Sequence, residues 1–588
     1  MARKKDKAAK MRELYQKLNG QNRFKWQDVN QEGHNFYLDN QLTEDETSAL
    51  KDQGMPHFTI NRIIPIVEML TFYATTKDPR WQAVGTEGSD GDIAAIHADM
   101  SDYIWYINNG KAKYAQTIQD ACTKSLGYLK VGIDPNSDNG MGDVSIDNIE
   151  PFDVYPDPQS RDVCFRDAAY IMIHKTITKA QAKILLPQHS SKIDKASQLE
   201  AYKYFNANKT VDARDFQSGD IHELWNTEGD EEMFVEYMEL YEKSRSQWWN
   251  VFYRIEPTEE ELDQIRMTMQ EEMRGVKDEL TVRAKEGIAQ LTAQLDAGEI
   301  IQERYDIEAA KLADGVEQQM AGIRDQRYQE MVAEATREEN VQLSDKEYRI
   351  AMKGSLKENI TNAIKFYKQQ IKLSCCVGDQ FLYEKTLPSE EYPIVPFHYN
   401  YTGTPYPMSA VAPLIGKQKE LNKAHQLMVH NASLGSSLRW MYTDGSIDTD
   451  HWEKFASAPG ALLPVNSGYE PPKEVLPAQL SNAFAGIVAE GKVDLEYLAG
   501  IYSSMQGDTG KQHETYKGLL AQDEYGTRRV KAWMDNSILP ALKQLGVVVK
   551  DYAQYLYTAQ KVLRIVEPDM DHGEVREREI NVPQYNEF

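Results

Sequence analysis

Apolar residues between Gly54 and Gly85 recur three or four positions apart, which is the spacing of one face of an α-helix. The positions that define this face are Ile60, Ile63, Ile64, Val67 and Leu70. The pattern stops at Asp78-Pro79, a combination that commonly ends a helix. The stretch therefore predicts a buried helix that leads into a short edge strand.

The residues before this helix, 11–50, indicate a helix, a turn and a second helix. Thr43 and Glu46 have the spacing of a capping box, in which the side chain of each residue binds the backbone N–H of the other. After the central stretch, residues 92–107 again have helical spacing, and another helix is expected after Gly110. The first 126 residues are therefore expected to be mainly helical.

Residues 128–134 and 143–149 alternate as two strands around a turn rich in Asp, Asn and Gly. The turn resembles a calcium loop, but an EF-hand requires Gly and Glu where Asn139 and Ser145 stand. We therefore interpret it as a hairpin turn without a metal ion.

The next part of the chain predicts more strands. Strands are expected at 169–174, 222–225, 234–241 and 248–253, with a helix that opens at Thr178 and a loop over 190–218. The alternation within these strands is typical of half-buried antiparallel pairs.

The segment 257–345 predicts a long helical hairpin. Thr258 and Glu261 form a capping box, and apolar residues then recur at helical spacing up to a turn at 296–298, beyond which a second series begins. At about 1.5 Å per residue, each limb could reach roughly 50 Å. Either an arm that contacts other proteins or a solvated, self-packed hairpin is compatible with this pattern.

Strands are expected again at 366–376, 381–385 and 392–397. A helix follows on which Gln418 and Asn422, four residues apart, lie on one face. Residues 440–480 predict strand-like pieces such as 461–465 between Pro and Gly residues, and helix is expected from Gly510 with a break at Pro540. Residues 562–588 are polar and strand-like.

Composition narrows the classes of function. The 588 residues contain 91 Asp and Glu against 66 Lys and Arg, so the formal net charge is −25. Such a chain is poorly suited to wrapping DNA by neutralising phosphates, whereas repulsion would keep DNA from sticking to a passage. The four cysteines show no metal-ligand spacing, and no apolar run approaches the roughly 20 residues of a membrane span. The basic N-terminus is expected to be a frayed, solvated end.

The sequence contains none of the common catalytic motifs in complete form. A P-loop is approached only at 507–512, where the spacing and the final residue are wrong. His513-Glu514 does not continue as a zinc-protease motif, and abundant carboxylates alone cannot argue for a metal-dependent nuclease. No catalytic residue, cofactor or metal ion is therefore predicted.

An ordered series of motifs resembles the portal proteins of tailed bacteriophages, especially the short-tailed, podovirus-like branch. No single motif is specific, but their order along the chain is. The series comprises Phe36-Tyr37, Asn61-Arg62-Ile63-Ile64-Pro65-Ile66-Val67, Asp78-Pro79, the hairpin from Gly127, Ile149 to Pro158, and Tyr392-Pro393-Ile394-Val395-Pro396.

The resemblance implies an α+β protomer with a mixed α/β wing, a helical stem, a clip and a reduced or truncated crown, assembled into a ring. The expected divisions are 1–30, an N-terminal tail; 31–256, the wing; 257–345, a long helical insertion that many similar portals lack; 346–440, strands leading to the stem or clip helix; 441–508, the return to the wing and a channel loop; and 509–588, C-terminal helices and the start of the crown.

The implied function is that of a portal, or head-to-tail connector, through which a separate terminase packages viral DNA into the capsid. The implied partners are other copies in a dodecameric ring, the major capsid protein, the terminase, a head-tail adaptor and double-stranded DNA, with assembly in the host cytoplasm and a final place at one vertex of the virion. A head-tail adaptor, another virion scaffold protein or, less favoured, a metal-dependent nuclease are the alternatives.

Two sets of site residues follow from the resemblance. Gln418 and Asn422 would pack subunits together in the stem or clip, although from the residues alone a polar face on a surface helix explains them equally well. Arg439, Lys473 and Lys492 are the basic candidates for contact with the channel or DNA, and each could also be an ordinary surface charge.

Overall fold

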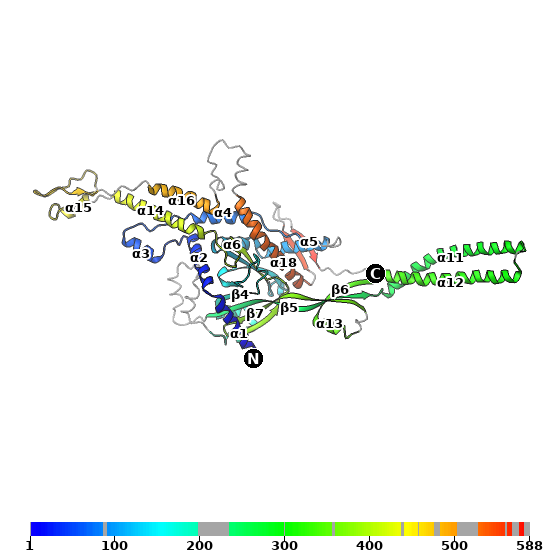
Figure 1. The fold of residues 1–588 in the computed structure, drawn as a ribbon. Helices are drawn as coiled ribbons and strands as arrows, with labels where there is room; N and C mark the ends of the chain where they lie inside the picture. The colour runs from blue at the N-terminus through cyan, green and yellow to red at the C-terminus, as the bar shows by residue number, and fades with distance from the viewer. Residues whose placement is uncertain are drawn as a thin grey trace, which may run out of the picture. The chain divides into compact units, whose positions relative to one another are not determined.

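The computed structural model forms two compact units, and each is described by itself. The first comprises Met1–Ser244 and Gln370–Phe588, and the second Arg245–Gln369. The structure describes residues 2–85, 91–197, 234–298, 300–354, 359–436, 440–456, 458–475, 483–501, 527–558, 561–566 and 575–580. Helices and several β-sheets are both present, which confirms the predicted α+β class (Figure 1). The predicted strand at 222–225 and the P-loop-like stretch at 507–512 lie outside the described residues.

Three helices begin the chain: α1 (Ala2–Leu18), α2 (Gln21–Tyr37) and α3 (Glu44–Asp52). The expectation of a frayed N-terminal end is wrong, because Ala8, Met11 and Leu18 of α1 are buried in one apolar cluster with β-strand residues. Lys7, Lys10 and Lys17 of α1 are exposed, so one face of this helix is solvated while the other packs. The capping box at the start of α3 is confirmed.

The central core lies between a small sheet and four helices. The helix predicted from the opening stretch is confirmed as α4 (Ile63–Thr75), and its neighbours are α5 (Gly91–Ile107), α6 (Gly110–Lys124) and α18 (Leu539–Leu556). The sheet has the order β2-β1-β9 with antiparallel pairs, and its strands are β1 (Leu126–Asp134), β2 (Asp143–Ile149) and β9 (Ile394–His398). The predicted hairpin turn is therefore confirmed.

The close approach of α6 to β1 depends on Gly127. A Cβ atom at this position would lie 2.0 Å from the backbone oxygen of Thr117.

The short strand predicted after Pro79 is wrong, since residues 80–85 form no strand. Instead, the Trp81 indole donates a hydrogen bond to Leu542 O at 2.7 Å and lies over Gly546.

A larger sheet has the strand order β3-β4-β5-β7-β8. The two strands predicted at 234–241 and 248–253 form one continuous strand, β5. A helix, α7, begins after Thr178 with the predicted capping box. The strands are β3 (Val154–Pro156), β4 (Tyr170–Thr178), β5 (Phe234–Ile255), β7 (Ile360–Val377) and β8 (Gln380–Thr386), and the short helices nearby are α7 (Lys179–Leu185) and α8 (Ser190–Ile193).

The second unit contains the predicted helical hairpin as α11 (Glu259–Asp296) and α12 (Gln302–Ala335), which pack along each other. Residues 337–344 do not continue the helix as expected but form β6 (Arg337–Ser344), which pairs with the outer half of β5. The outer half of β7 and helix α13 (Asp345–Ala351) complete this unit.

The rest of the chain belongs to the first unit. It contains α14 (Ile415–Ser436), β10 (Trp440–Met441), α15 (Thr449–Phe455), β11 (Lys473–Glu474) and α16 (Ala483–Ala499), followed by β12 (Lys561–Val566) paired with β13 (Val575–Ile580). The strand expected at 461–465 is absent from the described residues. A π-helical turn, Met534–Ile538, precedes Pro540 at the predicted break. The helix expected from Gly510 lies outside the described residues up to 526.

Candidate functional site

Helices α14 and α16 lie side by side and antiparallel (Figure 1). Lys417 Nζ of α14 lies 2.9 Å from Asp494 Oδ2 of α16. One turn along, a Cβ atom on Gly491 would lie 2.8 Å from Leu421 Cδ2. The small residue thus allows the two helices to approach closely, and the ion pair fixes their register.

The polar face of α14 binds an extended segment that precedes α4. Gln418 Nε2 donates to Ile60 O at 2.7 Å and to Asn422 Oδ1 at 3.0 Å. In return, the backbone N–H groups of Ile60 and Arg62 donate to Asn422 Oδ1 at 3.1 Å and to Gln418 Oε1 at 3.3 Å. The two side-chain amides therefore bind both N–H groups and a C=O group of this extended backbone segment.

Further hydrogen bonds extend this polar contact, which we call the polar ladder, on both sides of Gln418 and Asn422. Asn422 Nδ2 donates to Gln41 Oε1 at 2.6 Å, and Gln426 Nε2 donates to Phe58 O at 2.9 Å. Gln426 stands eight residues after Gln418, so the spacing that singled out the pair could also have identified the third member. The position of Gln41 in space could not be read from the sequence.

Gln418 and Asn422 are exposed to 0% and 5%, so the alternative of a polar face on a surface helix is wrong. Their hydrogen bonds join parts of one protomer. Packing between subunits stays a prediction for this pair.

The basic candidates do not converge in the described structure. Lys473 lies on β11 with its side chain 74% exposed and 3.5 Å from Glu470 Oε2. Lys492 is exposed on α16. Arg439 lies outside the described residues.

The chain between α14 and α16 has a small apolar centre of its own. The Trp440 and Trp452 rings meet edge to face with centroids 5.4 Å apart, and the Trp452 indole donates to Pro464 O at 2.9 Å. Around this centre many apolar side chains are exposed: Met441, Tyr442, Phe455, Leu462 and Tyr469. Exposed apolar side chains at this density are typical of a surface that contacts another protein.

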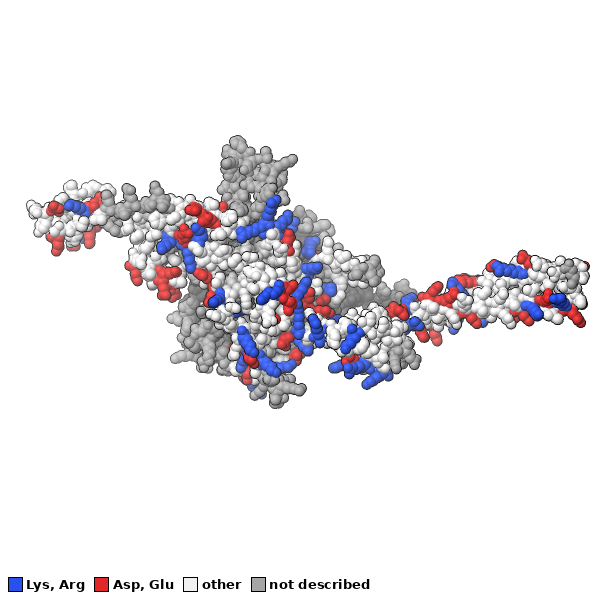
Figure 2. Space-filling model, in the orientation of Figure 1, with Lys and Arg blue, Asp and Glu red and all other residues white. Residues whose placement is uncertain are grey.

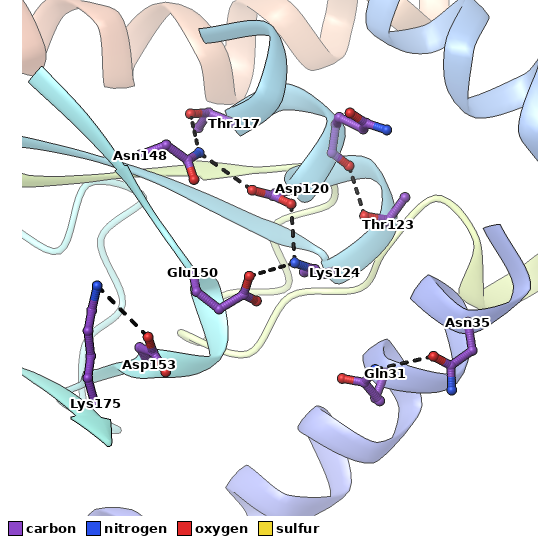
Figure 3. Close-up of polar contacts among 11 residues, drawn as sticks. Gln31, Asn35, Thr117, Asp120, Thr123, Lys124, Asn148, Glu150, Asp153 and Lys175 are labelled. Carbon is purple, nitrogen blue, oxygen red and sulfur yellow. Dashed lines mark hydrogen bonds and ion pairs between the residues drawn. The ribbon is translucent and has the colours of Figure 1, made fainter. Parts of the chain in front are cut away.

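A second group of charged residues is buried between α6 and β2, and sequence reasoning missed it. Figure 3 shows Lys124 between Asp120 and Glu150, with Nζ to oxygen distances of 3.3 and 2.7 Å. Asn148 donates to Thr117 Oγ1 at 2.9 Å beside them. Burial raises the pKa of Asp120 to about 6, although Lys124 opposes the shift.

The network is better suited to holding the fold than to catalysis. The Lys124 and Asp120 side chains are only 6% and 11% exposed, so a substrate could not reach them. Nearby, burial raises the pKa of Asp153 to about 7, and Lys175 Nζ, 4.0 Å away, only partly offsets this. No group of three or more His, Cys, Asp or Glu that could hold a metal ion occurs among the described residues.

None of the helices in the described part of the chain is long and apolar enough to cross a membrane.

A model of the family described as phage P22-like portal protein matches residues 21–585. No curated protein matches the chain. The chain is thus a bacteriophage portal protein, the head-to-tail connector of the capsid, as the order of motifs predicted. It belongs to the P22-like portal protein family.

Proposed function

We propose that twelve copies of this chain form a closed ring around a channel for double-stranded DNA, with α14 and α16 as the stem helices. The observation that carries the proposal is an exposed apolar strip on α16. Val493 and Tyr497, four residues apart on the same helix face, are 64% and 71% exposed. In a ring, the same strip on every copy would be buried against the neighbouring copy in a heterologous contact that closes.

This assignment extends the stem beyond the range first expected. Helix α16 falls in 441–508, where the sequence suggested a return to the wing, but its register with α14 supports one two-helix stem. The exposed apolar segment between the helices would then be the clip, which would contact the head-tail adaptor. We assign residues 31–256 and the strands after 359 to the wing, and the C-terminal helices to the start of the crown.

The polar ladder gives the stem a fixed point in the protomer. Gln418 and Asn422 tie α14 to the segment before α4, whose residues Ile63, Val67 and Leu70 are buried in the central core. A load applied to the stem would therefore reach that core through hydrogen bonds as well as through apolar contacts. We propose this as the role of the pair, in addition to any contact with a neighbouring subunit.

The proposed channel would guide DNA rather than bind it tightly. A net charge of −25 per copy disfavours broad phosphate contact. Lys473 and Lys492 remain candidates for a few weak contacts, as does Arg439. The terminase would supply ATP hydrolysis, and the major capsid protein would surround the ring at one vertex after assembly in the host cytoplasm.

Electron microscopy of negatively stained, purified protein tests the ring and the strip together. The wild type should give rings of about a dozen subunits, and the double variant Val493→Asp/Tyr497→Asp should give unassembled subunits. Ile184→Asp is a matched control, because Ile184 is 78% exposed on α7, away from the proposed stem. Rings that persist in the double variant would refute the role of the strip, and wild-type subunits that never form rings would refute the ring itself.

A further inference from the structure

The two long helices of the second unit form an arm with a strong excess of acidic residues. Helix α11 contains ten acidic and five basic residues, and α12 contains eight and four. Many of the arm's arginines are already paired with carboxylates of the arm. Examples are Arg266–Asp263, Arg283–Glu279, Arg304–Glu308 and Arg327–Glu272, at 2.8, 2.8, 3.4 and 3.1 Å. The arm is therefore negative along its length even after its internal ion pairs are counted.

The arm buries very little apolar surface by itself. Met273 is the one described side chain of α11 and α12 that is buried. Met267 and Val282 of α11 are 69% and 53% exposed, and Ile307 of α12 is 56% exposed. Since helices gain most of their stability from packing an apolar face, a hairpin this long and this exposed is expected to pack against something else.

The base from which the arm rises has the opposite charge. Its segments 245–258 and 336–369 contain nine basic and six acidic residues, within a chain whose net charge is −25. In Figure 2, blue side chains gather around α13, whereas red and blue are mixed along the arm. Arg337 and Arg349 of the base are exposed but pair with Glu261 and Asp345. The other exposed basic residues of the described base are Arg245, Arg254, Lys346, Lys353 and Lys365. We call these five residues, with the outer half of β7, the cationic base.

Among the described residues, the outer half of β7 pairs on one side only, and it is basic. β5 lies on one side of it, with Thr361 Oγ1 donating to Phe252 O at 3.2 Å, and the pairing with β8 begins only at Lys372. Ile364 and Tyr367 are 51% and 63% exposed. Exposed edges of this kind are usually covered by another element.

We propose that the acidic arm of one protomer packs on the cationic base of the next protomer in the ring. The two surfaces are complementary in charge, and both expose apolar side chains that the contact would bury. One copy carries both surfaces, so the contact is heterologous and can repeat around a closed ring. This contact rests on the ring proposed above and adds an interface outside the stem.

The outer part of the arm cannot reach its own base, although Glu261 at the start of α11 lies 3.5 Å from Arg337 of the base. Helix α11 starts at Glu259, four residues after β5 ends, and Glu271 is already twelve residues further on. At about 1.5 Å per residue this carboxylate lies roughly 18 Å along the helix from its start, and Asp278 and Glu286 lie further out. A lysine and a glutamate side chain together do not span that distance. A basic surface that binds these carboxylates would therefore belong to another molecule, and a second copy supplies one.

Isotope-resolved cross-linking tests the contact. Unassembled subunits labelled with ¹⁴N and with ¹⁵N are mixed, allowed to assemble, and treated with a carbodiimide, which joins carboxylates only to lysines in direct contact. We expect peptides that join Lys346, Lys353 or Lys365 to carboxylates of α11 or α12, with mixed-isotope pairs as abundant as unmixed pairs. Links from Lys311 to carboxylates of the same arm are the internal control, and these should be unmixed.

A charge-reversal series adds a second readout. The variant Lys346→Glu/Lys353→Glu/Lys365→Glu should come apart at a lower salt concentration than the wild type, whereas Lys25→Glu/Lys51→Glu/Lys77→Glu, at exposed lysines of the first unit, should not. The arm variant Glu271→Lys/Asp278→Lys/Glu286→Lys should restore stability when combined with the base variant. Rings that form normally but give only unmixed arm-to-base links, or mixed links from the arm to other regions, would overturn this proposal and leave the ring intact. The absence of any ring would instead refute the underlying ring proposal.

Discussion

Replacing Gln418 by leucine should free the segment before α4 from α14 without unfolding the protomer. Leucine has nearly the same volume and keeps the apolar contacts of a site that is 0% exposed. It removes the acceptor of the Arg62 N–H at 3.3 Å and the donor to Ile60 O at 2.7 Å. Each unsatisfied buried backbone group costs about 1–3 kcal/mol, and because this segment is only partly buried, we expect a total of about 3 kcal/mol.

Hydrogen exchange measures this loss where it occurs. Since 1.4 kcal/mol is a factor of ten, about 3 kcal/mol should speed exchange of the Ile60 and Arg62 amides about a hundredfold. Amides of β1 should exchange at the wild-type rate. Lys423→Leu is the matched control, because Lys423 is exposed on the same helix and should leave the segment protected. Unchanged exchange at Ile60 and Arg62, or an equal acceleration throughout the first unit, would refute the reasoning.

Three further variants probe the stem, the core and the buried charges. Gly491→Val should push α16 from α14, since a Cβ atom would lie 2.8 Å from Leu421 Cδ2; a cost of about 1–3 kcal/mol and fewer rings in electron micrographs are expected. Gly127→Ala should prevent soluble expression, because the new methyl group meets the rigid backbone oxygen of Thr117; a soluble variant with wild-type circular dichroism would contradict this. Glu239→Gln should lower the urea midpoint at pH 7, with a loss of about 3 kcal/mol, because it leaves the partly buried Lys130 without its charged partner. Asp153→Asn should raise the midpoint at pH 8 and raise it much less at pH 5; equal effects at both pH values would argue against the assigned charges.

Regular elements with strong apolar periodicity could be predicted from the sequence, and elements whose partners are distant could not. Helix α4 and the apolar face of α11 could be predicted because their apolar residues recur at helical spacing. Strand β6 is polar and exposed on both faces, so its pattern resembled the end of a helix. Helix α16 was not predicted because Gly486 and Gly491 weaken its helical pattern, although Gly491 allows α16 to pack closely against α14.

The candidate site shows the same difference between what a local pattern predicts and what depends on distant partners. The spacing of Gln418 and Asn422 placed both on one face of a helix, and that face is used. Their partners Ile60 and Arg62 stand more than 350 positions earlier, with separations of 358 and 356 residues from Gln418. A local pattern can therefore identify a polar face, but only the fold decides whether water, a neighbouring subunit or the protein's own backbone binds it.

Two buried carboxylates respond to pH in opposite directions because of how many donors each receives. Burial alone would raise the pKa of Glu239, but Lys130 Nζ at 2.6 Å, the Tyr237 hydroxyl and the Tyr241 hydroxyl at 2.6 Å together lower it below its usual range. A folded-state pKa below the unfolded value means that Glu239 stabilises the fold above the usual glutamate range, and that this contribution is lost as the pH falls through the folded pKa.

Burial raises the pKa of Asp153 to about 7, and Lys175 at 4.0 Å, with weaker help from Arg23 and Lys124, only partly opposes the shift. Here the folded state favours the protonated carboxyl, so stability falls as the pH rises from about 4, the usual aspartate value, to about 7, and acidification from pH 7 towards pH 4 relieves the cost. Because the Asp153 side chain is 27% exposed, solvent screens part of this effect, and a gain of about 1 kcal/mol for Asp153→Asn at pH 8 is expected. Moderate acid should therefore relieve strain at the α6–β2 side of the core before it breaks the Lys130–Glu239 link between the two sheets.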